Sequence, residues 1–210
     1  MEASLREAYG ETLVELGREN PDIVVLDADL SRSTMTQFFA RKFPERFFDC
    51  GIAEQNMVGI AAGLAASGKI PFASTFAVFV PGRCFDQIRM SIAQPRFNVK
   101  LVVTHGGISV GEDGTSHQSI EDLALIGSLP GFTVIVPADA IETVQAVRVA
   151  AANFGPCYIR LCRPKLPLVY DHSYRFNLGK AVKMRPGKDA TIIAIGLMVK
   201  AALEAAENLK

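Results

Sequence analysis

The chain has 210 residues, 49% of them hydrophobic, which is enough to bury one substantial core and to begin a second domain. Its 22 Lys and Arg residues balance 22 Asp and Glu residues, so we expect no nucleic acid and no membrane surface as a partner. Four scattered cysteines and three histidines favour a reduced, cytoplasmic protein without a metal site of its own.

The first part of the chain has the pattern of a helix followed by a buried strand. Apolar residues recur at helical spacing over residues 5–16, and Asn20-Pro21 ends the predicted helix. Residues 23–26 are an apolar run typical of a strand that is buried on both faces. Polar residues follow at 27–33, and open α/β sheets bind ligands just past the carboxyl ends of such strands.

Strands and helices alternate along most of the remaining chain. Further strands are predicted at residues 70–75, 99–104, 132–137 and 156–161. Helices are predicted at residues 35–43, 57–66, 81–93, 120–127 and 140–152. This alternation predicts an α/β fold with a mostly parallel sheet and helices on both of its faces.

The C-terminal part of the chain has the pattern of a new structural unit. Residues 166–188 are loop-like, residues 190–195 have the pattern of another buried strand, and residues 199–209 that of a helix. One strand and one helix cannot bury both of their faces alone, so we expect the start of a truncated second α/β domain. The predicted division is a domain at 1–165, a linker at 166–188 and the start of a second domain at 189–210.

Glu54 is placed at the mouth of a predicted helix that is rich in small residues. Gly59 and Gly63 weaken this helix but allow another backbone to approach closely. Burial at such a junction disfavours a charged carboxylate, which makes Glu54 a candidate for giving or accepting a proton. The alternative is an ordinary acid that caps the helix N-terminus.

Residues 105–119, with the sequence HGGISVGEDGTSHQS, form a long polar loop between a predicted strand and a predicted helix. Long loops without periodicity inside compact domains are usually functional. His105 and His117 lie near the two ends of this loop, which favours a function over a surface insertion.

These two stretches resemble one enzyme family. Gly51-Ile52-Ala53-Glu54-Gln55-Asn56, followed by the Gly/Ala helix, resembles the pyrimidine-binding domain of thiamine-diphosphate enzymes. The run from Val110 to Gln118, followed by Ser128-Leu129-Pro130 and Pro137-Ala138-Asp139, is similar to the transketolases in particular. The resemblance implies that residues 1–165 are the pyrimidine-binding domain and that 189–210 begin a transketolase C-terminal domain. It also implies that Glu54 contacts N1′ of the cofactor's aminopyrimidine.

The resemblance assigns substrate contacts to the loop. It implies that His105 and His117 hydrogen-bond the oxygens of the sugar and assist proton transfers, a role that suits an imidazole with an ordinary pKa near the operating pH. Asp113 would read the configuration of a hydroxyl beside the reacting carbon. Arg6, Ser33 and Arg163 match positions that hold the sugar phosphate, although Arg6 taken alone is equally well a surface charge.

The resemblance also assigns cofactor contacts. Phe76 and Phe79 match aromatic residues that stack on the aminopyrimidine, whereas taken alone they would more often belong to the core. Gly82 stands where transketolases commonly have a third aromatic residue. Asp29 matches an acid near the thiamine and the dimer contact.

The chain lacks the Gly-Asp-Gly…Asn type of motif with which the family holds the diphosphate through a divalent metal, Mg or Ca. The resemblance therefore implies the C-terminal subunit of a split transketolase, which forms a homodimer through its pyrimidine domain. A partner chain, the N-terminal transketolase subunit, would carry the diphosphate-binding domain, and this chain alone would be inactive. The implied reaction moves a two-carbon ketol unit from a ketose phosphate to an aldose phosphate.

Three other interpretations remain open. A 1-deoxyxylulose-5-phosphate synthase and the β subunit of a 2-oxo-acid dehydrogenase share an Ala-Glu-Gln-like segment, but the Glu-Asp-Gly-x-x-His-Gln run favours transketolase. A non-catalytic dimerisation or regulatory subunit could retain the same fold. Glu54, His105, Asp113, His117 and Arg163 together argue against that interpretation, because a structural subunit has no need of all five.

Overall fold

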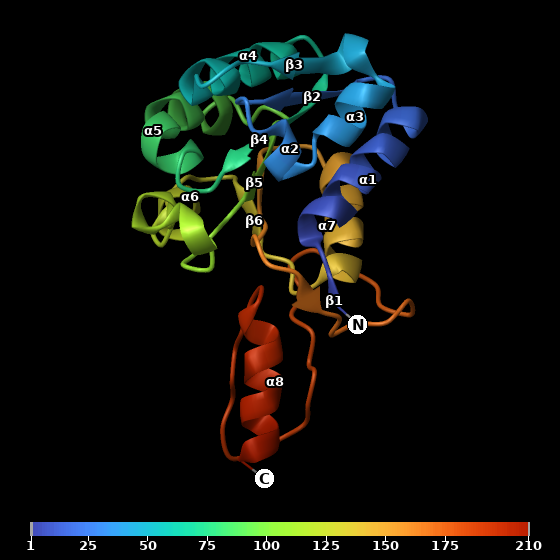
Figure 1. Ribbon diagram of the computed structural model, residues 1–210, viewed down its shortest axis with the longest axis vertical. Coiled ribbons are helices and arrows are strands. Elements are labelled where there is room, and N and C mark those ends of the chain that lie inside the picture. Colours follow the sequence, from blue (N-terminus) through green and yellow to red (C-terminus); the bar gives the residue numbers. More distant parts are fainter. Residues whose placement is uncertain (1, 210) are drawn as a thin grey trace.

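This computed structural model describes residues 2–209, in which six strands form a central parallel sheet (Figure 1). Its six strands have the order β3-β2-β4-β5-β7-β6, and every neighbouring pair is parallel. The strands are β2 (Ile23–Asp27), β3 (Phe47–Asp49), β4 (Ile70–Phe76), β5 (Lys100–Thr104), β6 (Thr133–Ile135) and β7 (Cys157–Arg160). The predicted α/β fold with a mostly parallel sheet is confirmed.

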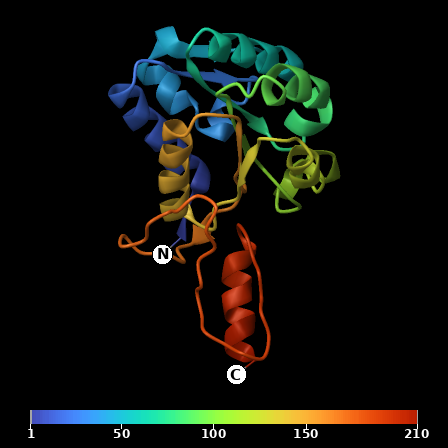
Figure 2. The same cartoon turned by 180° about the vertical axis from the view of Figure 1, so that it is seen from behind.

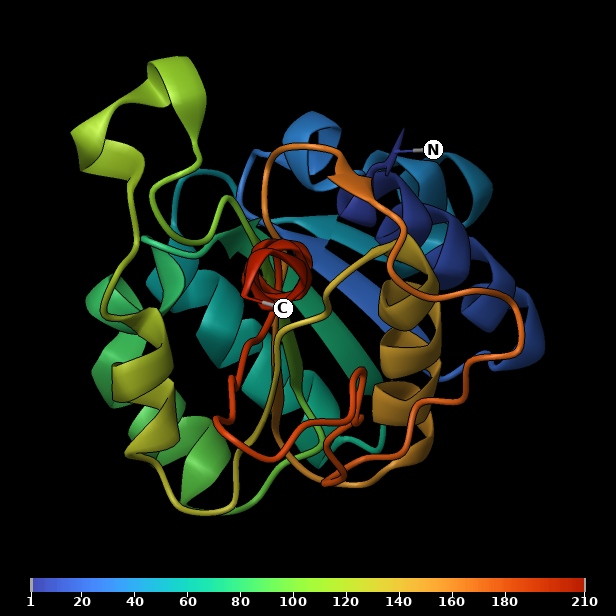
Figure 3. The ribbon, with the colours of Figure 1, turned by 90° about the horizontal axis from the view of Figure 1, so that it is seen from below.

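Helices cover both faces of the sheet (Figure 3). On one face, α1 (Leu5–Glu19) and α7 (Ala140–Ala152) pack side by side, with α3 (Gln37–Lys42) against α1. On the other face lie α4 (Glu54–Ala66), α5 (Val80–Gln87), a π-helical turn (Ile88–Ala93) and α6 (Asp122–Gly127). Successive residues of one strand supply the two cores, since Val25 faces α1 whereas Val24 and Leu26 face α4.

Local capping fixes where the two longest helices of the first face begin. The Ser4 hydroxyl accepts a hydrogen bond from the Glu7 backbone N–H at the start of α1. The Asp139 carboxylate accepts from the Glu142 backbone N–H at the start of α7, as predicted. Such caps satisfy N–H groups that have no partner within the helix.

The helix predicted at 35–43 is present as α3 but is shorter at both ends. A separate short helix, α2 (Ser31–Thr34), precedes it, and Met35 between the two lies in the left-handed region with φ of 69°. Short 3-10 turns also form at Pro44–Arg46, Gly111–Asp113 and Thr115–His117. A small antiparallel ladder joins β1 (Glu2–Ala3) to β8 (Leu166–Pro167).

The strand predicted at residues 190–195 is not formed, whereas the helix that follows is present as α8 (Met198–Asn208). A strand needs a neighbour for its backbone hydrogen bonds, and none of the described strands pairs with this segment. Ile193 is 90% exposed. Figures 1 and 2 show α8 standing apart from the sheet and its helices. The division at 165 and 188 stays a prediction, and its outer bounds, Met1 and Lys210, lie outside the described residues.

No helix within residues 2–209 combines the length and the apolar character that crossing a membrane requires.

Candidate active site

The residues of the candidate site lie at the edge of the sheet where the carboxyl ends of the strands meet. Asp27 ends β2, and Phe76 at the end of β4 pairs with Thr104 at the end of β5. His105 follows Thr104 directly, and Arg160 ends β7. Because all six strands are parallel, segments that are distant in sequence meet at this edge, as expected for a ligand site in an open α/β sheet.

Glu54 is the first residue of α4, so its predicted position at the mouth of a helix is confirmed. Its side chain is buried, and Oε1 accepts a hydrogen bond of 3.0 Å from Nη1 of Arg83. Within residues 2–209 the other carboxylate oxygen, Oε2, has no hydrogen-bond partner. Glu54 and Arg83 line an open hollow together with residues 52, 53, 55 and 56.

The outer face of α4 is open rather than packed. A methyl group added at Gly59 or Gly63 would meet no atom within 4 Å. Ile60 on the same helix is 37% exposed, and Ile52 just before it is 79% exposed. The close backbone approach that these glycines permit is therefore not made by any part of residues 2–209.

Four aromatic and imidazole rings form a row beside this hollow. The imidazole of His105 stacks on Phe76 with ring centroids 3.8 Å apart, and Phe76 stacks on Phe79 at 5.7 Å. His117 presents its ring edge-on to Phe79 at 5.4 Å. The structure thus brings together four residues that the sequence analysis selected separately. A flat heterocycle is the kind of ligand that such a surface stacks against.

His105 is buried at the inner end of the row. Its backbone lies in the left-handed region with φ of 59°, and Nδ1 is 2.9 Å from the hydroxyl oxygen of Thr104. Burial, followed by the positive charge of Arg6, lowers the pKa of His105 to about 4. The expectation that this histidine titrates near the operating pH is wrong for His105, which stays neutral there and offers hydrogen bonds without a charge.

Arg6 and Ser33 are in contact, as their predicted shared role requires. The guanidinium of Arg6 donates from Nη1 to the backbone carbonyl of Ser33 at 2.8 Å, so the contact is made by the main chain of Ser33. Burial and the nearby charge of Arg163 lower the pKa of Arg6. Nε of Arg6 is buried and has no partner within the described part of the chain. A buried N–H donor on a cation, close to a second cation, suits an anionic ligand.

Arg163 is tied to the polar loop. It forms a bidentate pair with Glu112, in which the Nη1 to Oε2 distance is 3.2 Å. Its Nε lies 4.0 Å from Oδ2 of Asp113. These contacts place Asp113 beside the basic pair and hold the Gly111–Asp113 turn near the end of β7.

Asp29 lies in a turn that Asp27 shapes. The backbone N–H of Asp29 donates to the Asp49 carboxylate at 3.1 Å, with φ of Asp29 at 61°. The buried carboxylate of Asp27 accepts three hydrogen bonds of 2.6–2.8 Å, from the Leu30 N–H and from the hydroxyls of Thr34 and Thr36. Burial nevertheless raises the pKa of Asp27 to about 6.

Residues 1–169 match the family described as "Transketolase, pyrimidine binding domain", and residues 179–210 match "Transketolase, C-terminal domain". The chain belongs to the transketolase family.

Individual transketolases agree with this assignment. A Methanocaldococcus jannaschii protein provisionally named as a transketolase C-terminal section is 50% identical over 208 residues, which are 98% of this chain and 66% of that protein. Human transketolase is 44% identical over 208 residues, again 98% of this chain but 33% of the human protein. A solved split-gene transketolase, described as an inactive β4 tetramer, is 57% identical with a TM-score of 0.89, over 98% of this chain and 66% of that one. The chain thus spans only part of the transketolases it matches.

Sequence reasoning missed three residues of the candidate site that the structure brings forward. Asp27 belongs to the predicted polar run at residues 27–33. The available signal for its buried role was the pair Thr34 and Thr36, whose hydroxyls bind its carboxylate. Arg83 lies four residues after Phe79, which is the spacing of neighbours on a helix. Arg160 had no local signal, because its partner Asp122 is 38 residues away.

Arg160 and Asp122 anchor the polar loop of this transketolase chain. Nε of Arg160 donates to the buried Oδ2 of Asp122 at 2.8 Å, and Nη2 donates to the Ser119 carbonyl at 3.1 Å. An added methyl group at Gly106 would lie 2.5 Å from Nε of Arg160. Gly107 pairs with Ser119 in an antiparallel bridge. The Gly107–Ser119 bridge therefore joins the two ends of the loop, and the Arg160 guanidinium holds the Ser119 end.

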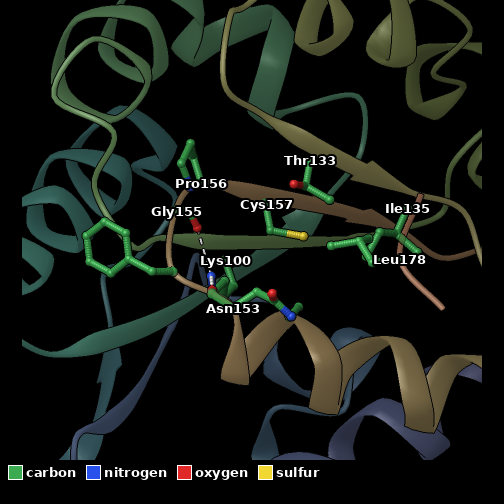
Figure 4. A pocket seen from close by; sticks show the side chains of 10 residues that line it. Lys100, Thr133, Ile135, Asn153, Gly155, Pro156, Cys157 and Leu178 are labelled. Atoms are coloured by element: carbon green, nitrogen blue, oxygen red, sulfur yellow. Dashed lines mark hydrogen bonds between the residues drawn. The ribbon is translucent and has the colours of Figure 1, made fainter. Parts of the chain in front are cut away.

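A second small pocket lies around Lys100, at the opposite edge of the sheet (Figure 4). The buried Lys100 ammonium donates to the carbonyls of Asn153 and Gly155, each at 2.8 Å, and to the Asn98 side chain at 2.6 Å. Burial lowers the pKa of Lys100 to about 8. All three N–H donors of the ammonium have partners, so this lysine stabilises the turn at residues 153–155 and offers no free donor to a ligand.

Within residues 2–209 there is no group of three or more His, Cys, Asp and Glu side chains arranged to hold a metal ion.

Proposed function

We propose that this chain forms the pyrimidine-binding side of a transketolase site that uses thiamine diphosphate. One observation carries the proposal: a single guanidinium, that of Arg83, contacts both the Glu54 carboxylate and the Phe79 ring. The predicted acid, Glu54, and the predicted stacking residue Phe79 therefore lie close enough together to contact the same side chain. A flat aminopyrimidine with a basic ring nitrogen needs such a pair of partners.

The residues present fit this part of the cofactor. Phe76 and Phe79 would stack on the ring and keep water from it, which contributes about 0.5–1.5 kcal/mol for each aromatic pair beyond area burial. Glu54 would hold and exchange a proton at N1′ through its free oxygen, Oε2. When bound, thiamine diphosphate supplies the nucleophilic carbon that accepts a two-carbon unit from a ketose and passes it to an aldose.

The basic pair and the loop would bind the sugar phosphate. The unpartnered Nε of the buried Arg6, together with Arg163, would hold the phosphate. Neutral His105 would hydrogen-bond the sugar oxygens, and the more exposed His117 would hydrogen-bond them and assist proton transfers. Asp113, placed beside Arg163, would read the configuration of a hydroxyl.

A partner chain would complete the site. We infer that an N-terminal transketolase subunit carries the diphosphate-binding domain and the divalent metal, Mg or Ca, and that this chain is inactive without it. The coverage of the transketolase relatives and the existence of a split-gene transketolase support this arrangement. The open face of α4, with Gly59, Gly63 and Ile60, would pack against a second copy of this chain. The four free cysteines support a reducing, cytoplasmic location.

The other interpretations have less support. The relatives described above are transketolases, not 1-deoxyxylulose-5-phosphate synthases or β subunits of 2-oxo-acid dehydrogenases. A non-catalytic subunit would not need a buried, half-partnered Glu54 beside stacked rings.

The test is a donor comparison in the two-chain mixture, with thiamine diphosphate and magnesium present. Ketol transfer from xylulose 5-phosphate to ribose 5-phosphate that requires both chains supports the proposal. Turnover with pyruvate but not with a ketose phosphate would assign one of the other enzymes. A complex that binds the cofactor but turns over neither donor would indicate a regulatory subunit.

A further inference from the structure

Arg83 occupies an unusual position for a surface arginine. Its side chain is half exposed, yet its Nη1 donates to the buried Glu54 carboxylate at 3.0 Å. Its guanidinium carbon lies 4.1 Å from the centroid of the Phe79 ring. Its backbone carbonyl accepts from the Gln55 side chain at 2.7 Å, which ties α5 to the first turn of α4.

Stability alone is a weak reason for this arrangement. Arg83 is half exposed, so solvent screens part of its attraction for Glu54. Stacking of its guanidinium on Phe79 at an exposed site adds little to the stability of the fold. The larger effect is on the orientation of Glu54. Fixing one carboxylate oxygen restricts a side chain that has three rotatable bonds.

The fixed oxygen is Oε1, and Oε2 is the one left without a partner in the described residues. A carboxylate held in this way presents a single acceptor in a defined direction. A methyl group added at Gly82 would meet no atom within 4 Å beyond its chain neighbours, so this position is open. Arg83 directly follows Gly82, the position where a third aromatic residue was expected, and its planar group lies on Phe79.

We infer that Arg83 is a positioning residue for Glu54. It holds Oε1, leaves Oε2 for the ring nitrogen of the aminopyrimidine, and extends the stacking surface of Phe79. This inference rests on the proposed function, because it concerns the same cofactor and the same acid.

The experiment compares Arg83→Gln and Arg83→Lys with the wild type in the two-chain complex with magnesium. Isothermal titration gives the dissociation constant for thiamine diphosphate, and ketol transfer gives kcat and the KM for the ketose phosphate. Arg89→Gln is the matched control, since Arg89 pairs with the exposed Asp86 at 3.2 Å on the adjoining helical turn. Thermal unfolding checks that each variant is folded.

Arg83→Gln is expected to raise the cofactor dissociation constant about 5- to 20-fold, because Glu54 loses a charged hydrogen-bond partner. It should lower kcat at saturating cofactor while leaving the KM for the ketose phosphate unchanged. Arg83→Lys should recover part of both losses, since it keeps the charge but loses the planar stack. Arg89→Gln should behave as the wild type.

Cofactor binding by Arg83→Gln that is as tight as in the wild type would overturn the inference. Tighter binding would also overturn it and would show that Arg83 is a placeholder that the cofactor displaces. If Arg83→Gln does not assemble with the partner chain, Arg83→Lys becomes the deciding variant. Cofactor affinity and kcat equal to those of the wild type in Arg83→Lys would then reject the role of the planar guanidinium. Failure of the proposed function is a different result, in which the wild-type complex itself shows no ketol transfer.

Discussion

The imidazole of His105 lies on the ring of Phe76, with centroids 3.8 Å apart and an angle of 25° between the planes. The contact links the predicted substrate loop to the predicted cofactor surface. It also buries the imidazole, which is why its protonated form is disfavoured.

Replacing His105 should change how the stability of the fold depends on pH. The pKa of His105 is about 4 in the folded chain and about 6.5 in an unfolded one, so between these values only the unfolded chain takes up the proton. This group therefore stabilises the fold fully above about pH 6.5, and that stability is lost as the pH falls toward 4.

The test is His105→Asn, since asparagine tolerates the left-handed backbone at this position. Urea unfolding gives the free energy of unfolding at pH 7 and at pH 5. Between these two values the wild type should lose about 2 kcal/mol more of it than the variant does. Equal losses in the two proteins would mean that His105 titrates normally in the folded chain.

Asp27 should have the opposite dependence. Its pKa is raised to about 6 in the folded chain, so its contribution is fully present below about pH 4 and is lost as the pH rises through about 6. In unfolding experiments, raising the pH from 4.5 to 7 should therefore lower the free energy of unfolding of the wild type by about 2 kcal/mol relative to that of Asp27→Asn. A pH-independent difference between the two proteins would refute the raised pKa.

Gly106→Ala should loosen the proposed substrate loop, residues 105–119. The added methyl group would lie 2.5 Å from Nε of Arg160, which is bonded to the buried Asp122, so the guanidinium or the loop must move. A displaced binding loop is expected to lower kcat/KM about 10- to 100-fold. Gly127→Ala, where a methyl group meets no atom within 4 Å, is the control and should retain activity. Similar kinetics for both variants would show that Arg160 does not position the loop.

Features that depend on neighbouring residues were predictable from the sequence. The buried strands, the Asp139 cap and the position of Glu54 at a helix start each follow from a short stretch of chain. The resemblance selected His105, Phe76, Phe79 and His117 from separate stretches, and the structure places them in one row.

Features that depend on distant partners were not predictable in this way. The Glu54 pair with Arg83 and the Asp122 pair with Arg160 join residues 29 and 38 positions apart. The lowered pKa of His105 comes from burial, which no spacing reveals. The strand predicted at 190–195 failed because periodicity identifies a segment suited to a sheet but not the neighbouring strand that it needs.

Lys100→Met should destabilise the fold without affecting the chemistry. The change removes the donor to the Asn153 and Gly155 carbonyls and leaves them without that partner, at a cost of about 2–4 kcal/mol. Lys69→Met, which breaks an exposed pair with Asp22, should change the free energy of unfolding by less than about 1 kcal/mol. Urea unfolding measures both. A Lys100 variant as stable as the Lys69 variant would contradict the structural role of Lys100.

The central claim is that Glu54 is the acid that activates the cofactor. The most direct measurement is ketol transfer by the two-chain complex carrying Glu54→Gln, at saturating thiamine diphosphate and magnesium, beside Glu11→Gln on the exposed side of α1. If Glu54 has this role, kcat falls at least about 100-fold in Glu54→Gln and stays at the wild-type level in Glu11→Gln. A Glu54→Gln complex with wild-type kcat would rule that role out.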